Sequence, residues 1–207
     1  LRPLDLNTES LQAFPAVAVS TANVRLSTST LNTPQTINAL LMRLGTALSG
    51  TATLTLTSGV LAGNPSINGC TVTCPIDFGP AEGIISGISN LTGPVTGSNG
   101  VTIVASNGTM SFGNLASTYT GTTTINSGTV LLFFGADVVP GQPGILGADT
   151  SPVVLMGRGN SAALVLSGPP PRVFGRDLLV RSDAELMRGV EPVLLAQGPQ
   201  VNGNIAL

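Results

Sequence analysis

Short segments of this chain alternate hydrophobic and polar residues, and glycine or proline separates many of these segments from one another. The clearest alternation lies in residues 51–57, where threonines flank Leu54 and Leu56. Because successive side chains of a strand point to opposite faces, we expect both leucines in the core and the threonines outward. Further strand-sized runs occupy residues 24–30, 101–104, 122–125, 129–134, 153–156, 162–166, 178–180 and 193–195.

These runs predict an all-β fold, because turn-forming residues bound them throughout the chain, which has 26 glycines and 15 prolines. Residues 54–59 and 125–130 resemble one another loosely, as the stacked rungs of a solenoid do. Rungs of roughly 20–25 residues would give about eight or nine rungs and a rod of roughly 40 Å. A β-sandwich is the weaker alternative, because its core usually contains more aromatic residues than one Tyr and six Phe.

Two segments have a helical pattern instead. Residues 33–44 begin with Thr-Pro and continue with apolar residues at the spacing of one helix face, so this pattern on its own predicts a helix. Residues 183–188 form a second short candidate, for which we favour a turn at a corner of the fold.

The composition excludes several classes of protein. Charged residues make up 9% of the chain, against about 25% in ordinary soluble proteins. With 42% hydrophobic residues and a mean hydropathy of +0.41, the chain can bury a core and does not have a disordered composition. The longest apolar run, residues 130–134, is far shorter than the roughly 18 residues of a transmembrane helix. Eight scattered Arg, no Lys and ten acids argue against nucleic acid as a partner.

The stretch from residue 119 to residue 130 is the most specific sequence in the chain. It resembles the signature of the autotransporter-associated β-strand repeat, a unit of long exported parallel β-helices. The resemblance rests on Tyr119, Thr120, Gly121, Thr123, Ile125 and Gly128. Thr122 stands where the family usually has a second glycine, and Ser117-Thr118 replaces the usual asparagine before the tyrosine.

The resemblance implies a right-handed parallel β-helix, with residues 1–207 forming a single β-solenoid segment. Under it, Gly121 and Gly128 lie at corners, Tyr119 packs near a corner, and residues 36–44 form a strand rather than a helix. The chain begins and ends within strand-like patterns and has no signal-peptide pattern at Leu1, so we expect it to be part of a longer polypeptide.

The function that this resemblance implies is structural and not catalytic. We expect a building block of an extracellular scaffold, filament or sheath, without a cofactor. Its partners would be neighbouring rungs of the same longer protein or further copies of the chain. The alternative is an adhesin-type passenger domain at the cell surface that binds glycans or other cells.

Cys70 and Cys74 are the only cysteines, and without histidine they cannot complete a tetrahedral zinc site. Because disulfides are common in exported proteins, we favour a local bridge between them, with a pair of free thiols as the alternative. The densest acidic patch contains Asp177, Asp183, Glu185 and Glu191, with Arg176, Arg181 and Arg188 between them. We interpret this patch as a solvated face of mixed charges, not as the paired carboxylates of a glycosidase.

Two further features are weaker. Asn90 and Asn107 match the acceptor pattern for N-glycosylation, which chance often produces in a chain rich in Asn and Thr. Some asparagines could instead form an internal ladder, with their amides stacked between rungs. Phe133 and Phe134 are adjacent, so a strand would direct them to opposite faces. One of them would then be exposed, and we expect it to contact another subunit.

Overall fold

The computed structural model describes residues 10–16, 19–64, 69–133, 137–157, 162–167, 173–181, 184–188, 200–201 and 204–206. These residues form strands, turns and bends, and none of them forms a helix. The strands are β1 Val19–Leu26, β2 Ser29–Leu31, β3 Gln35–Met42, β4 Ala47–Gly50, β5 Leu54–Ala62, β6 Cys70–Val72, β7 Ile76–Asp77, β8 Gly83–Ser86, β9 Ile88–Leu91, β10 Val95–Thr96, β11 Val101–Phe112, β12 Thr123–Phe133, β13 Val153–Leu155, β14 Ala162–Ser167, β15 Val173–Phe174, β16 Leu178–Val180, β17 Ala184–Arg188, β18 Gln200–Val201 and β19 Ile205–Ala206.

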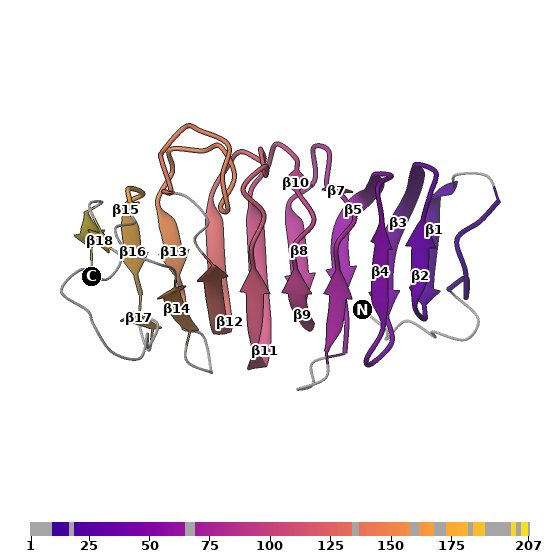
Figure 1. Ribbon diagram of the computed structural model, residues 1–207, viewed down its shortest axis with the longest axis horizontal. Coiled ribbons are helices and arrows are strands. Elements are labelled where there is room, and N and C mark those ends of the chain that lie inside the picture. The colour runs from indigo at the N-terminus through magenta and orange to yellow at the C-terminus, as the bar shows by residue number, and fades with distance from the viewer. Residues whose placement is uncertain are drawn as a thin grey trace.

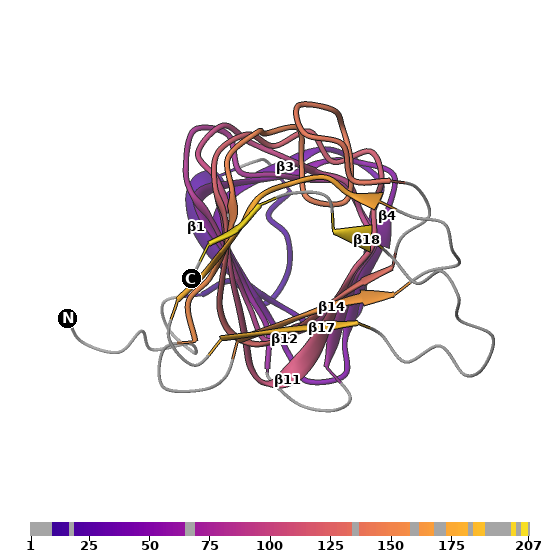
Figure 2. The ribbon, with the colours of Figure 1, turned by 90° about the vertical axis from the view of Figure 1, so that its left-hand side faces the viewer.

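The strands stack into a parallel β-solenoid of about seven turns, which confirms the predicted fold class. Figure 1 shows the strands side by side along the long axis, and Figure 2 shows the same turns end-on as a ring. At ~4.8 Å per turn, seven turns span ~34 Å. The turns differ in length: 18 residues separate Gly83 from its partner Val101, but 30 separate Thr123 from Val153.

Two long parallel ladders and one shorter ladder form the sides of the ring. The first ladder joins β1, β3, β5, β8, β11, β12, β13, β16 and β19. The second joins β2, β4, β6, β9, β11, β12, β14 and β17. The third is shorter and joins the N-terminal ends of β3 and β5 to β7 and β10.

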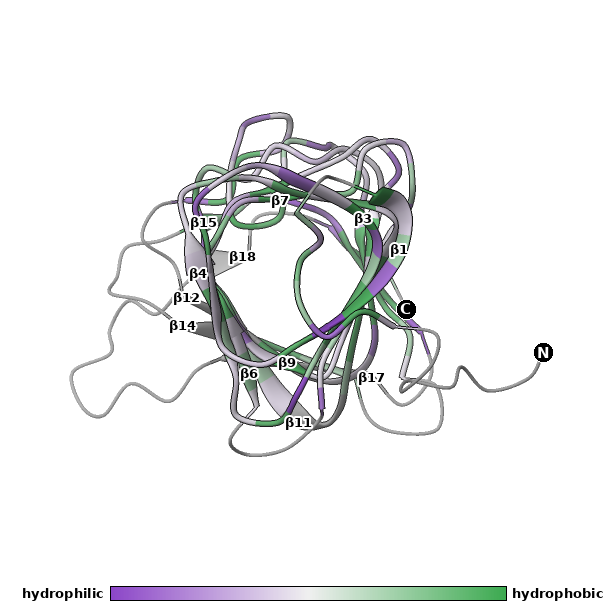
Figure 3. Cartoon of the chain, turned by 90° about the vertical axis from the view of Figure 1, so that its right-hand side faces the viewer, coloured by the Kyte–Doolittle hydropathy of each residue, from purple (hydrophilic) through white to green (hydrophobic). Residues whose placement is uncertain are grey.

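Aliphatic side chains fill the inside of the ring in columns that follow the ladders. The main column of the first ladder contains Leu40, Leu61, Ile85, Ile103, Ile125 and Leu155, all fully buried. Leu54 and Leu56 are fully buried as expected, and the neighbouring threonines are partly or largely exposed. Burial of each such side chain contributes about 1.5–3 kcal/mol. Figure 3 views the N-terminal end and shows hydrophobic and hydrophilic residues alternating around the turns.

Gly128 forms the corner at which β12 passes from the first ladder to the second. Ile125 still pairs with Leu155 of the first ladder, whereas Gly128 pairs with Ala162 of the second. The φ angle of Gly128 is 80°, in the left-handed region that favours glycine. The predicted corners at Gly121 and Gly128 are confirmed, but the two runs that flank Gly128 belong to one continuous strand.

The helical spacing in residues 33–44 has a different origin from a helix. β3 crosses a corner, and its register shifts between Ile37 and Ala39. Ile37 and Leu40 therefore both point inward although they are three residues apart. The strand prediction is confirmed, and the corner explains the misleading pattern.

Other predictions need correction. Residues 184–188 form strand β17 and not a turn, because they add to the second ladder beside β14. The run at residues 24–30 is divided between β1 and β2, since a further corner lies within it. The run at residues 193–195 lies outside the described residues.

Candidate functional site

The repeat signature surrounds a buried tyrosine. Tyr119 is fully buried, and its hydroxyl shares a hydrogen bond of 2.9 Å with the hydroxyl of Thr123. Burial raises the pKa of Tyr119 to about 12, so the phenol stays protonated. The ring lies so close to Gly147 of the next turn that a Cβ there would approach two of its carbons to 3.0 Å. The predicted packing role of Tyr119 is therefore confirmed.

The carboxylate of Asp149, in the long loop after β12, contacts the tight turn of the signature at Gly121. Asp149 accepts hydrogen bonds from the backbone N–H of Ser151, at 2.5 Å, and of Gly121, at 2.7 Å. Hydrogen bonds from Ser151 and from Gly121 hold the pKa of the Asp149 carboxyl at about 2. Asp149 thus fixes the tight turn at Gly121 to residues 137–152, the segment that leads from β12 toward β13.

Arg176 approaches this loop from the next turn and is 1% exposed. Its Nη1 donates to the carbonyl oxygen of Leu146 at 2.7 Å, and its Nε donates to that of Ser151 at 3.0 Å. Its Nη2 also donates to Ser151. Burial lowers the pKa of Arg176, but guanidinium is so basic that the side chain keeps its charge.

The interpretation of Arg176 as part of a solvated charged face is therefore wrong. It is a buried clamp between two successive turns, and Asp177 beside it accepts a hydrogen bond from the backbone N–H of Asn204. Arg181 is exposed, as expected. Asp183 and Glu191 lie outside the described residues, as do the side chains of Glu185 and Arg188.

Cys70 and Cys74 are both buried and free, so the structure does not contain the predicted disulfide. The chain between them is largely extended through β6, which would place their Cα atoms roughly 13 Å apart. A disulfide requires about 7 Å or less. The Cys70 thiol donates instead to the carbonyl oxygen of Arg43 at 3.1 Å. Burial raises the pKa of Cys74 to about 11.

Polar side chains on the outside of the ring form hydrogen bonds between turns. Asn38 Nδ2 donates to Asn23 Oδ1 at 2.8 Å, a contact on the outside and not the internal asparagine ladder that the sequence suggested. Thr96 Oγ1 similarly donates to Asp77 Oδ1 at 2.9 Å. These contacts connect successive turns through side chains in addition to the backbone ladders.

The structure does not test the remaining predicted sites. Asn90 lies within β9 and is paired with Thr71 on one side and Ser111 on the other, an unusual place for a glycosylation acceptor. The side chain of Asn107 lies outside the described part of β11. Phe133 ends β12 without a described side chain, and Phe134 is outside the described residues, so their subunit contact stays a prediction.

The N-terminal end of the ring holds a feature that the sequence patterns did not indicate. Residues 10–16 cross this end, and in Figure 2 the indigo chain before β1 curves across the inside of the ring. Leu11 pairs with the edge of β1: its N–H donates to Asn23 at 2.8 Å, and its carbonyl oxygen accepts from Arg25 at 2.7 Å. Phe14 packs against the core.

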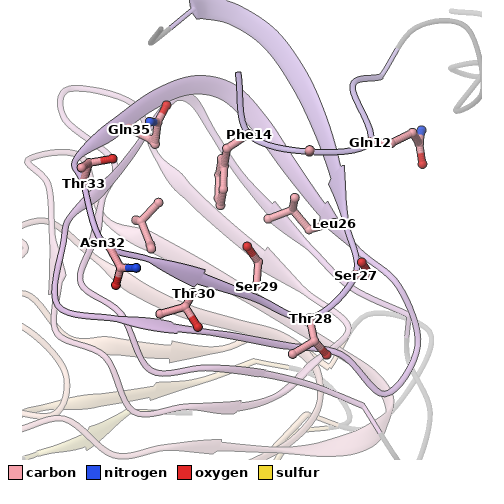
Figure 4. A pocket seen from close by; sticks show the side chains of 12 residues that line it. Gln12, Phe14, Leu26, Ser27, Thr28, Ser29, Thr30, Asn32, Thr33 and Gln35 are labelled. Atoms are coloured by element: carbon pink, nitrogen blue, oxygen red, sulfur yellow. The ribbon is translucent and has the colours of Figure 1, made fainter. Parts of the chain in front are cut away.

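A cavity of about 500 Å³ lies between this crossing segment and β2. Figure 4 shows the ring of Phe14 pointing into the cavity and the side chain of Gln12 turned away from it. The lining residues are Gln12, Ala13, Phe14, Leu26, Ser27, Thr28, Ser29, Thr30, Leu31, Asn32, Thr33 and Gln35.

Gln35 occupies an inward position at the edge of this cavity. In the third ladder it stands in register with Leu54, and then with Ile76 and Val95 in the following turns. Those three residues are fully buried, so Gln35 puts an amide at the first position of an apolar column. Its Oε1 is buried and has no hydrogen-bond partner among the described residues.

No protein-family model matches the chain, and no curated protein or solved structure is significantly similar to it. The resemblance to autotransporter-associated repeats therefore stays a prediction that rests on the signature. Among the described residues, no group of three or more cysteine or acidic side chains is placed to hold a metal ion. No helix that is long and apolar enough to cross a membrane occurs in the described part of the chain.

Proposed function

We propose that this chain is a non-catalytic structural protein, a β-helical building block of an extracellular scaffold, filament or sheath. The observation that carries the proposal is the continuity of the first ladder, which runs through nine strands from β1 to β19. The most elaborate polar cluster, around Arg176, is directed at backbone groups of the neighbouring turn. This cluster holds neighbouring turns together. Tyr119 and Asp149 are also hydrogen-bonded to residues of the chain, namely Thr123 and Gly121.

The outer surface supports an extracellular setting. Contacts between turns such as Asn38 to Asn23 are hydrogen bonds between neutral groups, which salt screens little. Few charges depend on pH in a chain with 9% charged residues and no histidine. The likeness of residues 119–130 to repeats of exported β-helices supports the same location.

Electron microscopy of the native material, before any denaturing step, tests the structural role. We expect ordered filaments or sheets with a repeat related to a rod of ~34 Å per chain. Dispersed single particles without any higher-order assembly would contradict a scaffold. Release of reducing sugar from polysaccharide by the purified chain would contradict the non-catalytic part of the proposal.

Antibody labelling of intact cells tests the location. The antibody should label unbroken cells or the matrix around them, with a cytosolic protein as the negative control. Labelling that occurs only after lysis would contradict an extracellular role. Amine-reactive surface labels are unsuitable because the chain contains no lysine.

A further inference from the structure

The chain before β1 closes the N-terminal end of the ring by a short path. Residues 10–16, which we call the strap, cross this end inside the outline of the ring (Figure 2). Only 13 residues separate Leu11 from its partner Val24, whereas 16 separate Val24 from Leu40 and 21 separate Leu40 from Leu61. The strap therefore does not offer the full outline on which another turn would stack.

The strap is attached less firmly than the strands of the ladders. Leu11 forms two backbone hydrogen bonds with β1, at 2.8 and 2.7 Å. Gln12 Oε1 accepts a hydrogen bond of 2.8 Å from Arg43 Nη2, and both side chains are exposed. Phe14 is only partly buried against the core. Strand β3, by contrast, pairs with β1 on one side and β5 on the other through most of its length. The strap is thus easier to open than the turn beneath it.

Strand edges lie open behind the strap. Among the described residues, β2 pairs with β4 alone, and the third ladder begins with β3. The cavity between the strap and β2 shows that the strap passes β2 without pairing with it. Unpaired edges of this kind readily pair with another chain. A strand of another molecule reaches them only after the strap has moved, because the strap lies across the end and already occupies the edge of β1.

The C-terminal end of the ring provides the matching edge. In the described part of the chain, β19 is the last strand of the first ladder and pairs only with β16. Ile205 is 51% exposed, although its partner Leu178 is buried, so a further strand would cover it. Asn23 in β1 and Ala206 in β19 stand at the two ends of one column that runs through the first ladder. Addition of β19 to β1 of a second copy would continue this ladder in register.

We propose that the strap is an autoinhibitory contact that controls head-to-tail assembly of this chain. In place, it keeps the N-terminal end closed. Once displaced, it leaves the edges of β1, β2 and β3 to a second copy, whose β19 takes the position of Leu11. This regulation rests on the filament role proposed above. Head-to-tail contacts along the axis of a solenoid do not close on themselves and give an open filament.

Sedimentation velocity of the full chain over a range of concentrations tests this control. Leu11→Pro removes the N–H that donates to Asn23, so we expect this variant to associate. The wild type should remain a single species up to concentrations at least about tenfold higher. Leu11→Val keeps the N–H and an apolar side chain, so it is the matched control and should behave as the wild type. Equal association of the wild type and Leu11→Pro would overturn the proposal.

Cross-linking separates the expected contact from aggregation of a misfolded variant. In the Leu11→Pro chain, Asn23→Cys and Ala206→Cys would lie side by side across the contact, with Cα atoms about 4.8 Å apart, which allows a disulfide. Mild oxidation should link this variant into dimers and larger oligomers, and the two native cysteines are buried. Ile205→Cys in place of Ala206→Cys should abolish the link, since adjacent residues of a strand point to opposite faces. Equal cross-linking of the two pairs would indicate aggregation without register and overturn the proposal.

The outcomes also separate this proposal from the structural role. Native filaments together with a Leu11→Pro variant that stays a single species would overturn the strap proposal and leave the scaffold intact. Register-specific cross-linking of Leu11→Pro, with only single particles in the native material, would contradict the scaffold and support the strap as a block on pairing at this end.

Discussion

Arg176 connects two turns of the solenoid through the backbone carbonyl oxygens of Leu146 and Ser151. Replacing it by methionine, of similar length, would leave the carbonyl groups of Leu146 and Ser151 buried without their present donors. We expect Arg176→Met to lower the free energy of unfolding by about 1–3 kcal/mol. Urea denaturation followed by circular dichroism measures this change.

Arg181 is the matched control for Arg176 because it is exposed and lies only five residues away. We expect Arg181→Met to change stability by less than about 0.5 kcal/mol. Equal effects of the two substitutions would show that the buried contacts of Arg176 contribute nothing specific.

Because of Asp149, the stability of the solenoid should depend on pH in the acid range. Its pKa of about 2 in the folded chain lies below its ordinary value of 3.8, so the folded state binds fewer protons. Its contribution is therefore complete above pH 4 and is lost as the pH falls from about 4 toward 2. Since the group is partly exposed, we expect only about 1 kcal/mol after solvent screening. The loss of stability between pH 5 and pH 2 should be smaller in Asp149→Asn, and an equal loss would contradict this account.

At the residue scale, sequence reasoning identified Tyr119 as a packing residue but placed Arg176 on the surface. A lone tyrosine beside a turn glycine is a local signal. The acceptors of Arg176 lie 25 and 30 residues earlier in the chain, and no local pattern indicates that they meet it. The inward position of Gln35 and its unpaired Oε1 could not be predicted for the same reason, because they depend on the register of the third ladder.

Among the elements, β12 depends most clearly on one residue. A Cβ on Gly128 would lie 2.6 Å from the Cβ of Ala105, and the φ angle of 80° disfavours any other residue. We expect Gly128→Ala to destabilise the fold by about 2–4 kcal/mol, through backbone strain and overlap together. Thermal and urea unfolding of the purified variant would measure the loss.

Gly113 provides the control for Gly128. A Cβ there would meet only Thr92 Cγ2, at 3.8 Å, which is ordinary contact. Gly113→Ala should therefore stay within about 0.5 kcal/mol of the wild type. A similar loss in both variants would mean that the backbone strain and overlap at Gly128 are not the cause of the loss.

At the element scale, most strands could be predicted because period-two alternation survives within each straight segment. Apart from those at Gly121 and Gly128, corners could not be predicted, because a register shift such as that between Ile37 and Ala39 resets the alternation. The same shift produced the helical spacing in β3. The division of residues 24–30 and the continuity of β12 were missed for this reason too.

For the whole molecule, the regular register predicts that a complete turn can be removed. Deleting residues 84–101 takes out 18 residues, the spacing between Gly83 and Val101, and leaves Thr102 in the place of Ile84. Because stability in a solenoid is roughly a sum over turns and their interfaces, the shorter chain should fold with lower stability. Small-angle scattering should show a rod shorter by ~4.8 Å.

Deleting residues 84–100 instead leaves the register one residue out. Every side chain up to the next corner would then point to the opposite face, which exposes Ile103 and buries polar neighbours. We expect this variant to be insoluble or unfolded. If both deletions behave alike, register does not govern the assembly of turns.

The unequal lengths of the turns have a mechanical consequence. A force that pulls the two ends apart acts along the backbone hydrogen bonds and opens them one turn at a time. Release of the 18 residues from Gly83 to Val101 would lengthen the chain by up to ~60 Å, and release of the 30 from Thr123 to Val153 by up to ~100 Å. Arg176 and Asp149 form hydrogen bonds to residues of the longer of these two turns. Under tension the solenoid would thus lengthen in unequal steps. The longest step would require the hydrogen bonds of Arg176 and Asp149 to break first.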